Sequence, residues 1–155
     1  MEHGVLDARL KQYNDIMKEN DKLYRGAAKK YGFSECEFWI LYYLRSEYGE
    51  PMQSGICNSF YLPKQSIHSA LKKLEADGYI ALTAGGNRRS KGILLTSEGK
   101  RICAETVDHI IEAEKSALGS LSEEEQEKFM NLFNKYTEKF KLNMRENSEK
   151  GGNIT

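Results

Sequence analysis

A helix followed by two strand-like runs, within residues 63–96, constrains the fold of this chain more than any other segment. Pro63 suits the first position of a helix, because its missing backbone N–H would be unpaired there in any case. Gly78 is typical of the residue that follows a helix C-terminus. Residues 79–83 and 93–96 are strand-like, and the glycine-rich segment GGNRRSKG (85–92) between them predicts a β-hairpin.

Helical periodicity divides residues 63–77 into an apolar face and a polar face. At about 100° per residue, Ile67, Leu71 and Leu74 point the same way, and these side chains are predicted to be buried. Ala70 lies at the edge of this face. The other side can read base edges with Gln and Ser and meet phosphates with Lys, although an ordinary solvated helix face has a similar composition. The residues predicted to contact DNA from this helix are Lys64, Gln65, Ser66, His68, Ser69, Lys72 and Lys73.

The charge of the chain is concentrated in its middle third. The net charge is +0 over 155 residues, but residues 63–101 hold eight Lys and Arg against three Asp and Glu, a net charge of +5. Arg88, Arg89 and Lys91 lie at the predicted hairpin tip, and arginine is favoured in the narrow, strongly negative minor groove of DNA. Ile93 and Leu95 are predicted to anchor the base of the hairpin on the core by strand alternation. This distribution favours a nucleic acid as partner.

The rest of the chain is predicted to be helical, which gives a mainly α fold with one small β-hairpin. A capping box at Ser34 and Glu37 predicts the start of a helix, which is strongly apolar, is therefore expected to be mostly buried, and stops near residues 48–49. Residues 52–60 predict a further helix of two turns. One helix is expected from Thr96 or Ser97 to about Leu118. Another should follow the capping box at Ser122, with an aromatic stripe over 129–140. The segment 5–31 has a heptad seam, typical of a helix with a partner helix in the same or a second chain, at Leu6, Leu10, Tyr13, Met17, Asn20, Tyr24, Ala27 and Tyr31.

The order short helix, turn, helix and hairpin is that of a winged helix-turn-helix. Within it, the phrases LPKQSIHSALKKLEADGYI (62–80) and NRRSKGILLTSEGK (87–100) resemble the multiple-antibiotic-resistance regulator (MarR) family of bacterial transcription factors. The likeness covers nearly the whole chain. Asn87 stands where the family usually has Asp at the wing tip, and Pro63 stands where it usually has a Ser or Thr cap.

The resemblance implies a homodimeric, sequence-specific DNA-binding regulator, expected to be a repressor on a pseudo-palindromic operator in double-stranded DNA. The expected winged helix-turn-helix domain covers residues 34–99. Residues 1–33 and 100–147 are expected to form the helical dimerisation region, and residues 148–155 a disordered tail. The family often responds to a small aromatic compound, and the candidate pocket residues are Tyr13, Trp39, Tyr42 and Tyr43. These aromatic side chains could equally be ordinary core residues.

The sequence gives weaker support for redox sensing and metal sensing. Cys36 lies in the first turn of a predicted helix, where the dipole favours thiolate, and Cys57 lies near the turn, so a redox-sensing regulator is an alternative. Cys103 is expected to be packed. Glu105, His109 and Glu112 share a helix face, but with one His an exposed salt-bridging face is favoured over a metal site. No cofactor or metal is expected.

Enzymatic function is not indicated, because the nucleophile-elbow, phosphate-loop and zinc-protease motifs are all absent. No apolar run approaches the roughly 18 residues of a membrane span, and the N-terminus lacks the apolar core of a secretory signal. A cytoplasmic location is therefore expected. The remaining alternative is a winged helix that serves as a protein-interaction module and never binds DNA.

Overall fold

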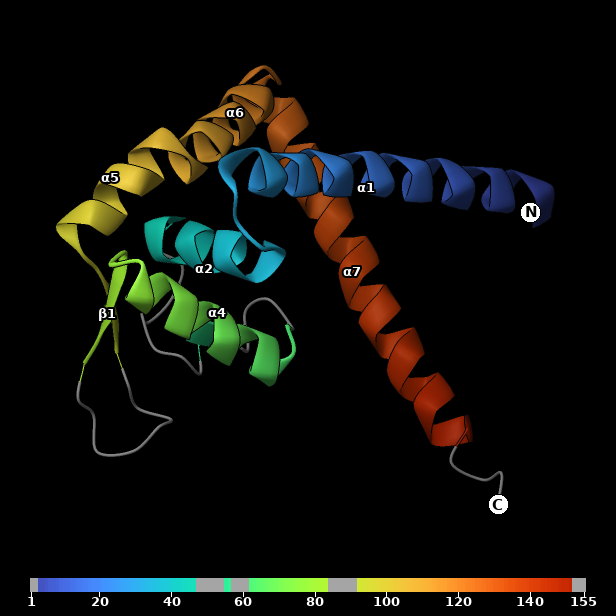
Figure 1. Ribbon diagram of the computed structural model, residues 1–155. Helices are drawn as coiled ribbons and strands as arrows, with labels where there is room; N and C mark the ends of the chain where they lie inside the picture. The colour runs from blue at the N-terminus through green and yellow to red at the C-terminus, as the bar shows by residue number, and fades with distance from the viewer. Residues whose placement is uncertain (1–2, 47–54, 57–61, 84–91, 152–155) are drawn as a thin grey trace. The chain divides into compact units, whose positions relative to one another are not determined.

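The computed structural model describes residues 3–46, 55–56, 62–83 and 92–151 of the chain, and Figure 1 traces the order of its elements. Residues 1–112 form one compact unit and residues 113–155 form a second. The core of the first unit is built by α2, α4 and the hairpin, together with the C-terminal end of α1, Ile56, Cys103 of α5 and Val107 of α6. The described elements are α1 (His3–Tyr31), α2 (Glu35–Ser46), α4 (Lys64–Ala76), β1 (Ile80–Leu82), β2 (Ile93–Leu95), α5 (Ser97–Glu105), α6 (Val107–Gly119) and α7 (Glu123–Gly151).

Helix α1 ends where the sequence predicts. Gly32 takes a positive φ of 76°, a backbone conformation that favours glycine, and Phe33 N–H donates to Ala28 O at 2.9 Å to close the helix. Only the C-terminal part of the heptad seam enters the core, through Ala27 and the half-buried Tyr24 and Tyr31. Large apolar side chains further toward the N-terminus are exposed, among them Leu6, Leu10 and Met17.

Helix α2 begins with the predicted capping box. Ser34 N–H donates to Glu37 Oε2 at 2.8 Å, and Glu37 N–H donates to Ser34 Oγ at 3.1 Å. The helix is buried on most sides, as predicted, with Phe38 and Leu41 almost fully enclosed. Its predicted end near residues 48–49 lies outside the described residues.

Helix α4 packs against α2 through the apolar face that the periodicity predicts. Ile67, Leu71 and Leu74 are buried, which confirms the prediction. Pro63 is the N-cap rather than the first helical residue, and no side chain caps the helix there. Gly78 follows the C-cap with a φ of 78°, as predicted. Of the short helix predicted over 52–60, Gly55 and the buried Ile56 are helical, and the remainder lies outside the described residues.

The two strands pair antiparallel, with Ile80 opposite Leu95 and Leu82 opposite Ile93. Ile93 is buried, Leu94 is exposed and Leu95 is half-buried, which confirms the predicted alternation at the base of the hairpin. Just beyond the paired strands, Gly92 N–H donates a hydrogen bond to Thr83 Oγ1 at 2.9 Å. The hairpin tip, with Arg88, Arg89 and Lys91, lies outside the described residues.

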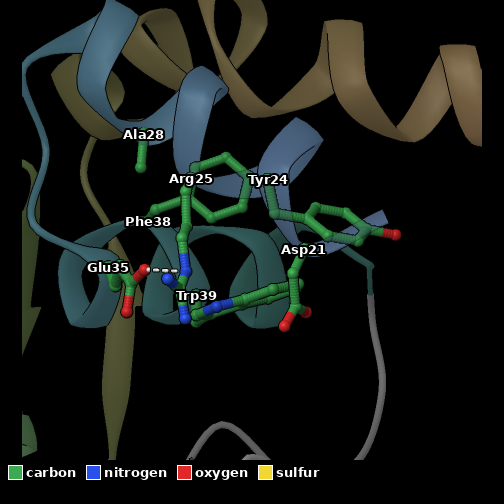
Figure 2. Close-up of a pocket in the computed structure, with 7 residues that line it drawn as sticks. All are labelled: Asp21, Tyr24, Arg25, Ala28, Glu35, Phe38 and Trp39. Carbon is green, nitrogen blue, oxygen red and sulfur yellow. Dashed lines mark ion pairs between the residues drawn. The ribbon is translucent and has the colours of Figure 1, made fainter. Parts of the chain in front are cut away.

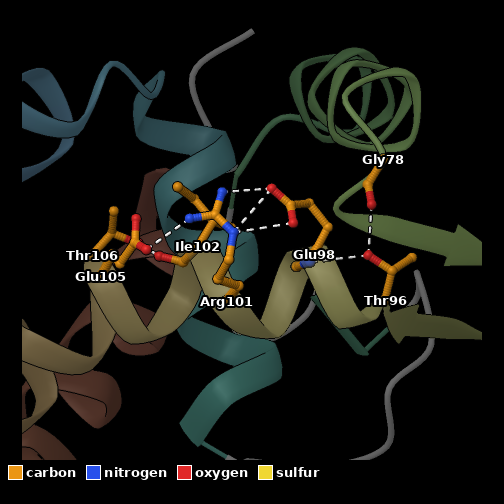
Figure 3. A network of polar contacts seen from close by, with 8 residues as sticks. Gly78, Thr96, Glu98, Arg101, Ile102, Glu105 and Thr106 are labelled. Carbon is orange, nitrogen blue, oxygen red and sulfur yellow. Dashed lines mark hydrogen bonds and ion pairs between the residues drawn. The ribbon is translucent and has the colours of Figure 1, made fainter.

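The prediction of one helix from residue 96 or 97 to about 118 is wrong, because α5 and α6 are separated at Thr106. Thr106 has φ −131° and ψ −89°, outside the helical region. Its hydroxyl donates to Ile102 O at 2.5 Å (Figure 3). Its N–H donates to Cys103 O at 3.1 Å. A β-branched residue whose hydroxyl bonds the preceding turn competes with the regular ladder, and a helical periodicity does not reveal that competition.

Thr96 caps α5 and ties it to the end of α4. Its Oγ1 accepts from Gly99 N–H at 2.9 Å and donates to Gly78 O at 2.6 Å (Figure 3). Of the two capping residues considered from sequence, Thr96 is therefore the cap. The same hydroxyl serves the start of one helix and the end of another.

Helix α7, in the second unit, begins at the predicted capping box of Ser122 and Glu125. It continues through Gly151, so residues 148–151 of the predicted disordered tail are helical, and residues 152–155 lie outside the described residues. Residues 141–150 are rich in helix formers, which accounts for the extra turns. The aromatic stripe of Phe129, Phe133, Tyr136 and Phe140 is exposed on this helix. The other exposed large apolar side chains of α7 are Met130, Leu132, Leu142 and Met144.

Candidate nucleic-acid interface

The outward side of α4 is an uninterrupted polar surface, which we call the polar face of α4. It consists of Lys64, Gln65, Ser66, His68, Ser69, Lys72 and Lys73. All of these side chains are exposed, whereas Ile67, Ala70, Leu71 and Leu74 on the other side are buried. The apolar contacts with α2 therefore fix which side of α4 faces outward. This helix can present hydrogen-bonding groups and cations together to a large polyanionic partner.

The two adjacent lysines on the polar face of α4 have different environments. Lys73 Nζ lies 2.6 Å from Asp77 Oδ2, and this hydrogen bond raises the pKa of Lys73. Lys72 forms no ion pair with another described residue. Lys72 is therefore the better placed of the two to contact a phosphate without first giving up an intramolecular partner.

A groove runs along the edge of the polar face, between α4 and the start of α2. Its lining includes Ser66, Ser69 and Lys73 from α4, and Cys36 from α2. The position of Cys36 at the start of α2 does not give it a lowered pKa: burial raises the pKa of this thiol, and the carboxylates of Glu35 and Glu37 raise it further.

Of the other two cysteines, the structure describes Cys103, which is not suited to redox sensing. Cys103 is fully buried, as predicted, and burial raises the pKa of its thiol to about 12. Such a thiol is almost entirely protonated near neutral pH and is a poor nucleophile. Cys57 lies outside the described residues. Glu105, one member of the metal cluster considered from sequence, forms an ion pair with Arg101, with 2.7 Å between Arg101 Nη1 and Glu105 Oε1.

An aromatic pocket of about 100 Å³ lies between α1 and α2 (Figure 2). The rings of Tyr24 and Trp39 are tilted, with their centroids 4.8 Å apart. Arg25 Nε lies 2.9 Å from Glu35 Oε1 in an ion pair at this pocket (Figure 2). The lining residues are Asp21, Tyr24, Arg25, Ala28, Glu35, Phe38 and Trp39.

Only one of the four predicted pocket residues lines this cavity, namely Trp39. Tyr42 contacts the Trp39 ring at 5.3 Å between centroids, Tyr43 is buried in the core, and Tyr13 is half-buried on α1. Sequence reasoning missed the charged lining residues. Arg25 and Glu35 come from two helices joined by a turn, and no local pattern in the sequence indicates that their side chains meet.

The fold and the outward-facing α4, followed by an antiparallel hairpin, define the chain as a winged helix-turn-helix protein. No protein-family model matches the chain. It is 36% identical over 101 residues to the HTH-type transcriptional regulator PecS of Dickeya dadantii, a match that covers 63% of this chain and 60% of PecS. It is 25% identical over 116 residues to the HTH-type transcriptional regulator YwoH of Bacillus subtilis, covering 75% of this chain and 80% of YwoH.

Solved structures give the same fold along most of the chain. NMB1585, a MarR family regulator from Neisseria meningitidis, superimposes with a TM-score of 0.75 at 21% identity, covering 90% of this chain and 98% of that protein. S. aureus MepR, in a structure with DNA, gives a TM-score of 0.66 at 19% identity, covering 85% of this chain and 97% of MepR. The chain therefore has the winged helix-turn-helix fold of a MarR family regulator.

Proposed function

We propose that this chain is a sequence-specific DNA-binding transcriptional regulator that represses transcription in the bacterial cytoplasm. The observation that carries the proposal is the polar face of α4, which is exposed along its whole length while the opposite side is buried. Support comes from PecS and YwoH, both named HTH-type transcriptional regulators, and from the similarity to MepR, whose structure contains DNA. A promoter–reporter assay distinguishes repression from activation.

The contacts of the proposed complex follow from the chemistry of each group. Gln65 and Ser69 on α4 are suited to reading base edges in the major groove, and Lys72 to binding a phosphate. Arg88 and Arg89 at the hairpin tip are proposed to enter the adjacent minor groove, where closely spaced phosphates favour arginine. Phosphate contacts then fix the register of the protein, and base contacts select the sequence.

A homodimer is part of the same proposal. Helices α1 and α7 each expose a series of large apolar side chains, including Leu6 and Leu10 on α1 and Phe133 and Phe140 on α7. Apolar surface of this extent is unusual on a monomeric protein and is typical of a surface that another chain covers. A second copy of the chain supplies the same surfaces, and its α4 supplies a second DNA-reading face about one DNA turn away.

Removal of the Lys72 side chain is the direct test of DNA binding. In Lys72→Ala, we expect the affinity for mixed genomic DNA to fall and the slope of log affinity against log salt to decrease by about 1, because one phosphate contact is lost. Fluorescence anisotropy over a salt series measures both quantities. Lys18→Ala, at an exposed position on α1, is the matched control and should leave the slope unchanged.

The same salt titration distinguishes a DNA-binding protein from a protein-interaction module. Several phosphate contacts make the affinity of the unmodified protein fall steeply as salt rises. A flat salt response, or no binding at any salt concentration, would instead indicate a winged helix that serves protein partners.

A small aromatic effector in the pocket between α1 and α2 completes the proposal. Tyr24, Phe38 and Trp39 supply ring faces, and the Arg25–Glu35 pair supplies charge at the same cavity. A cavity of about 100 Å³ is small compared with pockets for drug-sized ligands, so a single-ring compound suits it best.

Trp39 is the only tryptophan in the chain and therefore reports on this pocket. Titration with phenol, benzoate or benzylamine should change the Trp39 fluorescence with a saturating dose dependence for at least one of the three. The same compound should lose this saturation in Tyr24→Ala, because Tyr24 forms one wall of the cavity. A change in Trp39 fluorescence that rises linearly with the concentration of every compound, as it does for free tryptophan, would contradict an effector site here.

A further inference from the structure

The regular hydrogen-bond ladder of α5 is interrupted at Thr106, before α6 begins. In a continuous helix, Ile102 O would accept from Thr106 N–H, but here it accepts from the Thr106 hydroxyl at 2.5 Å. The Thr106 N–H bonds one residue later, to Cys103 O at 3.1 Å. Side-chain contacts at the start of α6 therefore contribute to its direction.

Two neighbouring residues anchor the start of α6 to the first unit. Val107 is fully buried in the core. Asp108 is held by Arg45 of α2, which donates from Nε to Oδ1 at 2.8 Å and from its terminal nitrogen to Oδ2 at 2.7 Å. These partners are 63 residues apart in the sequence, so the pair joins two elements that the backbone does not connect directly.

The geometry of the Arg45–Asp108 pair makes it directional. Two parallel hydrogen bonds constrain the angle between the partners as well as their distance. The side chains are 35% and 27% exposed, so water competes with the pair less than with a fully exposed one. Arg45 lies in the last turn of α2 and Asp108 in the first turn of α6, so each charge also suits the dipole of its own helix.

Helix α6 continues to Gly119, past the end of the first unit at Glu112. Helix α6 therefore connects the unit that contains α4 to the C-terminal helices. We propose that the Arg45–Asp108 pair is a positioning pair that sets the separation of the two α4 helices in the dimer, and so selects the spacing of the two DNA half-sites. This inference rests on the proposed function as a dimeric DNA-binding regulator.

The test uses the full chain and a library of random double-stranded DNA. Asp108→Asn keeps the shape of the side chain but removes its charge, and Arg45→Lys keeps the charge but removes the two-pronged geometry. The unmodified protein should select paired half-sites at one spacing. In each variant, we expect the preference for that spacing over its neighbours to fall by about three- to tenfold, with the half-site sequence unchanged.

Glu98→Gln is the matched control, because it removes an ion pair with Arg101 that lies within α5 and joins no second element. It should leave the spacing unchanged. Paired half-sites whose spacing stays the same in both Arg45→Lys and Asp108→Asn would overturn the positioning role and leave the proposed function intact. If circular dichroism shows both variants unfolded, the pair is a requirement of folding and the positioning role is also overturned. If the unmodified protein selects no paired half-sites, the proposed function fails and this inference fails with it.

Discussion

Replacing Phe133 with glutamate should convert the protein to monomers and weaken its binding to a two-half-site operator by about 10²- to 10⁴-fold, the usual gain from linking two binding modules. Phe133 lies in the middle of the exposed aromatic stripe of α7, where it stacks on Phe129 with 6.0 Å between ring centroids. A carboxylate at this position would lose its water on dimerisation without gaining a partner. Sedimentation equilibrium measures the mass, and anisotropy measures the affinity.

Asn131→Glu is the matched control for this prediction. It adds the same single negative charge to α7, at an exposed position on the opposite side of the helix from the stripe. We expect this variant to remain dimeric and to bind DNA as before. A dimer that persists in Phe133→Glu would mean that the stripe is not part of the interface.

Gly99→Ala should lower the free energy of unfolding by about 3 kcal/mol, the upper end of the usual cost of an extra methyl group in a packed site. A Cβ at this position would lie 1.9 Å from Tyr79 O and 3.2 Å from Leu95 Cδ2. The carbonyl cannot move away easily, because Tyr79 O already accepts from Thr96 N–H at 3.1 Å. Urea denaturation followed by circular dichroism measures the change.

Gly26→Ala separates this effect from the general effect of alanine in a helix. Gly26 is exposed within α1, and a methyl group added there would meet no atom within 4 Å, so alanine should raise stability by about 1 kcal/mol through helix propensity. Equal stability of Gly99→Ala and the unmodified protein would mean that the junction between the hairpin and α5 adapts to the methyl group.

The local signals in the sequence predicted most element boundaries correctly. The capping residues Ser34 and Ser122, and the glycines at 32 and 78, act within one or two turns of the chain, so their effect can be inferred from neighbouring residues alone. The buried side of α4 was predictable for the same reason, since its periodicity is a property of one helix. Its exposed side was predictable as a surface, and the contacts that it makes with DNA stay predictions.

The features that sequence reasoning missed depend on contacts between distant segments. The break at Thr106 occurs inside a segment whose apolar periodicity is compatible with one helix. The Arg45–Asp108 pair spans 63 positions, and the pocket pair Arg25–Glu35 depends on how α1 and α2 pack. The pKa of Cys36 was expected to fall from its place on α2, whereas burial, which only the tertiary structure determines, raises it.

The hydroxyl of Thr96 has a mechanical consequence. Because it bonds both Gly78 O, just beyond α4, and Gly99 N–H, in the first turn of α5, it joins the two helices through a single atom. The orientation of α5 is thus coupled directly to the end of α4 and, through the adjoining strands, to the base of the hairpin. Thr96→Val would keep the shape of the side chain while removing both of its hydrogen bonds, so this direct link between the ends of the two helices would be lost.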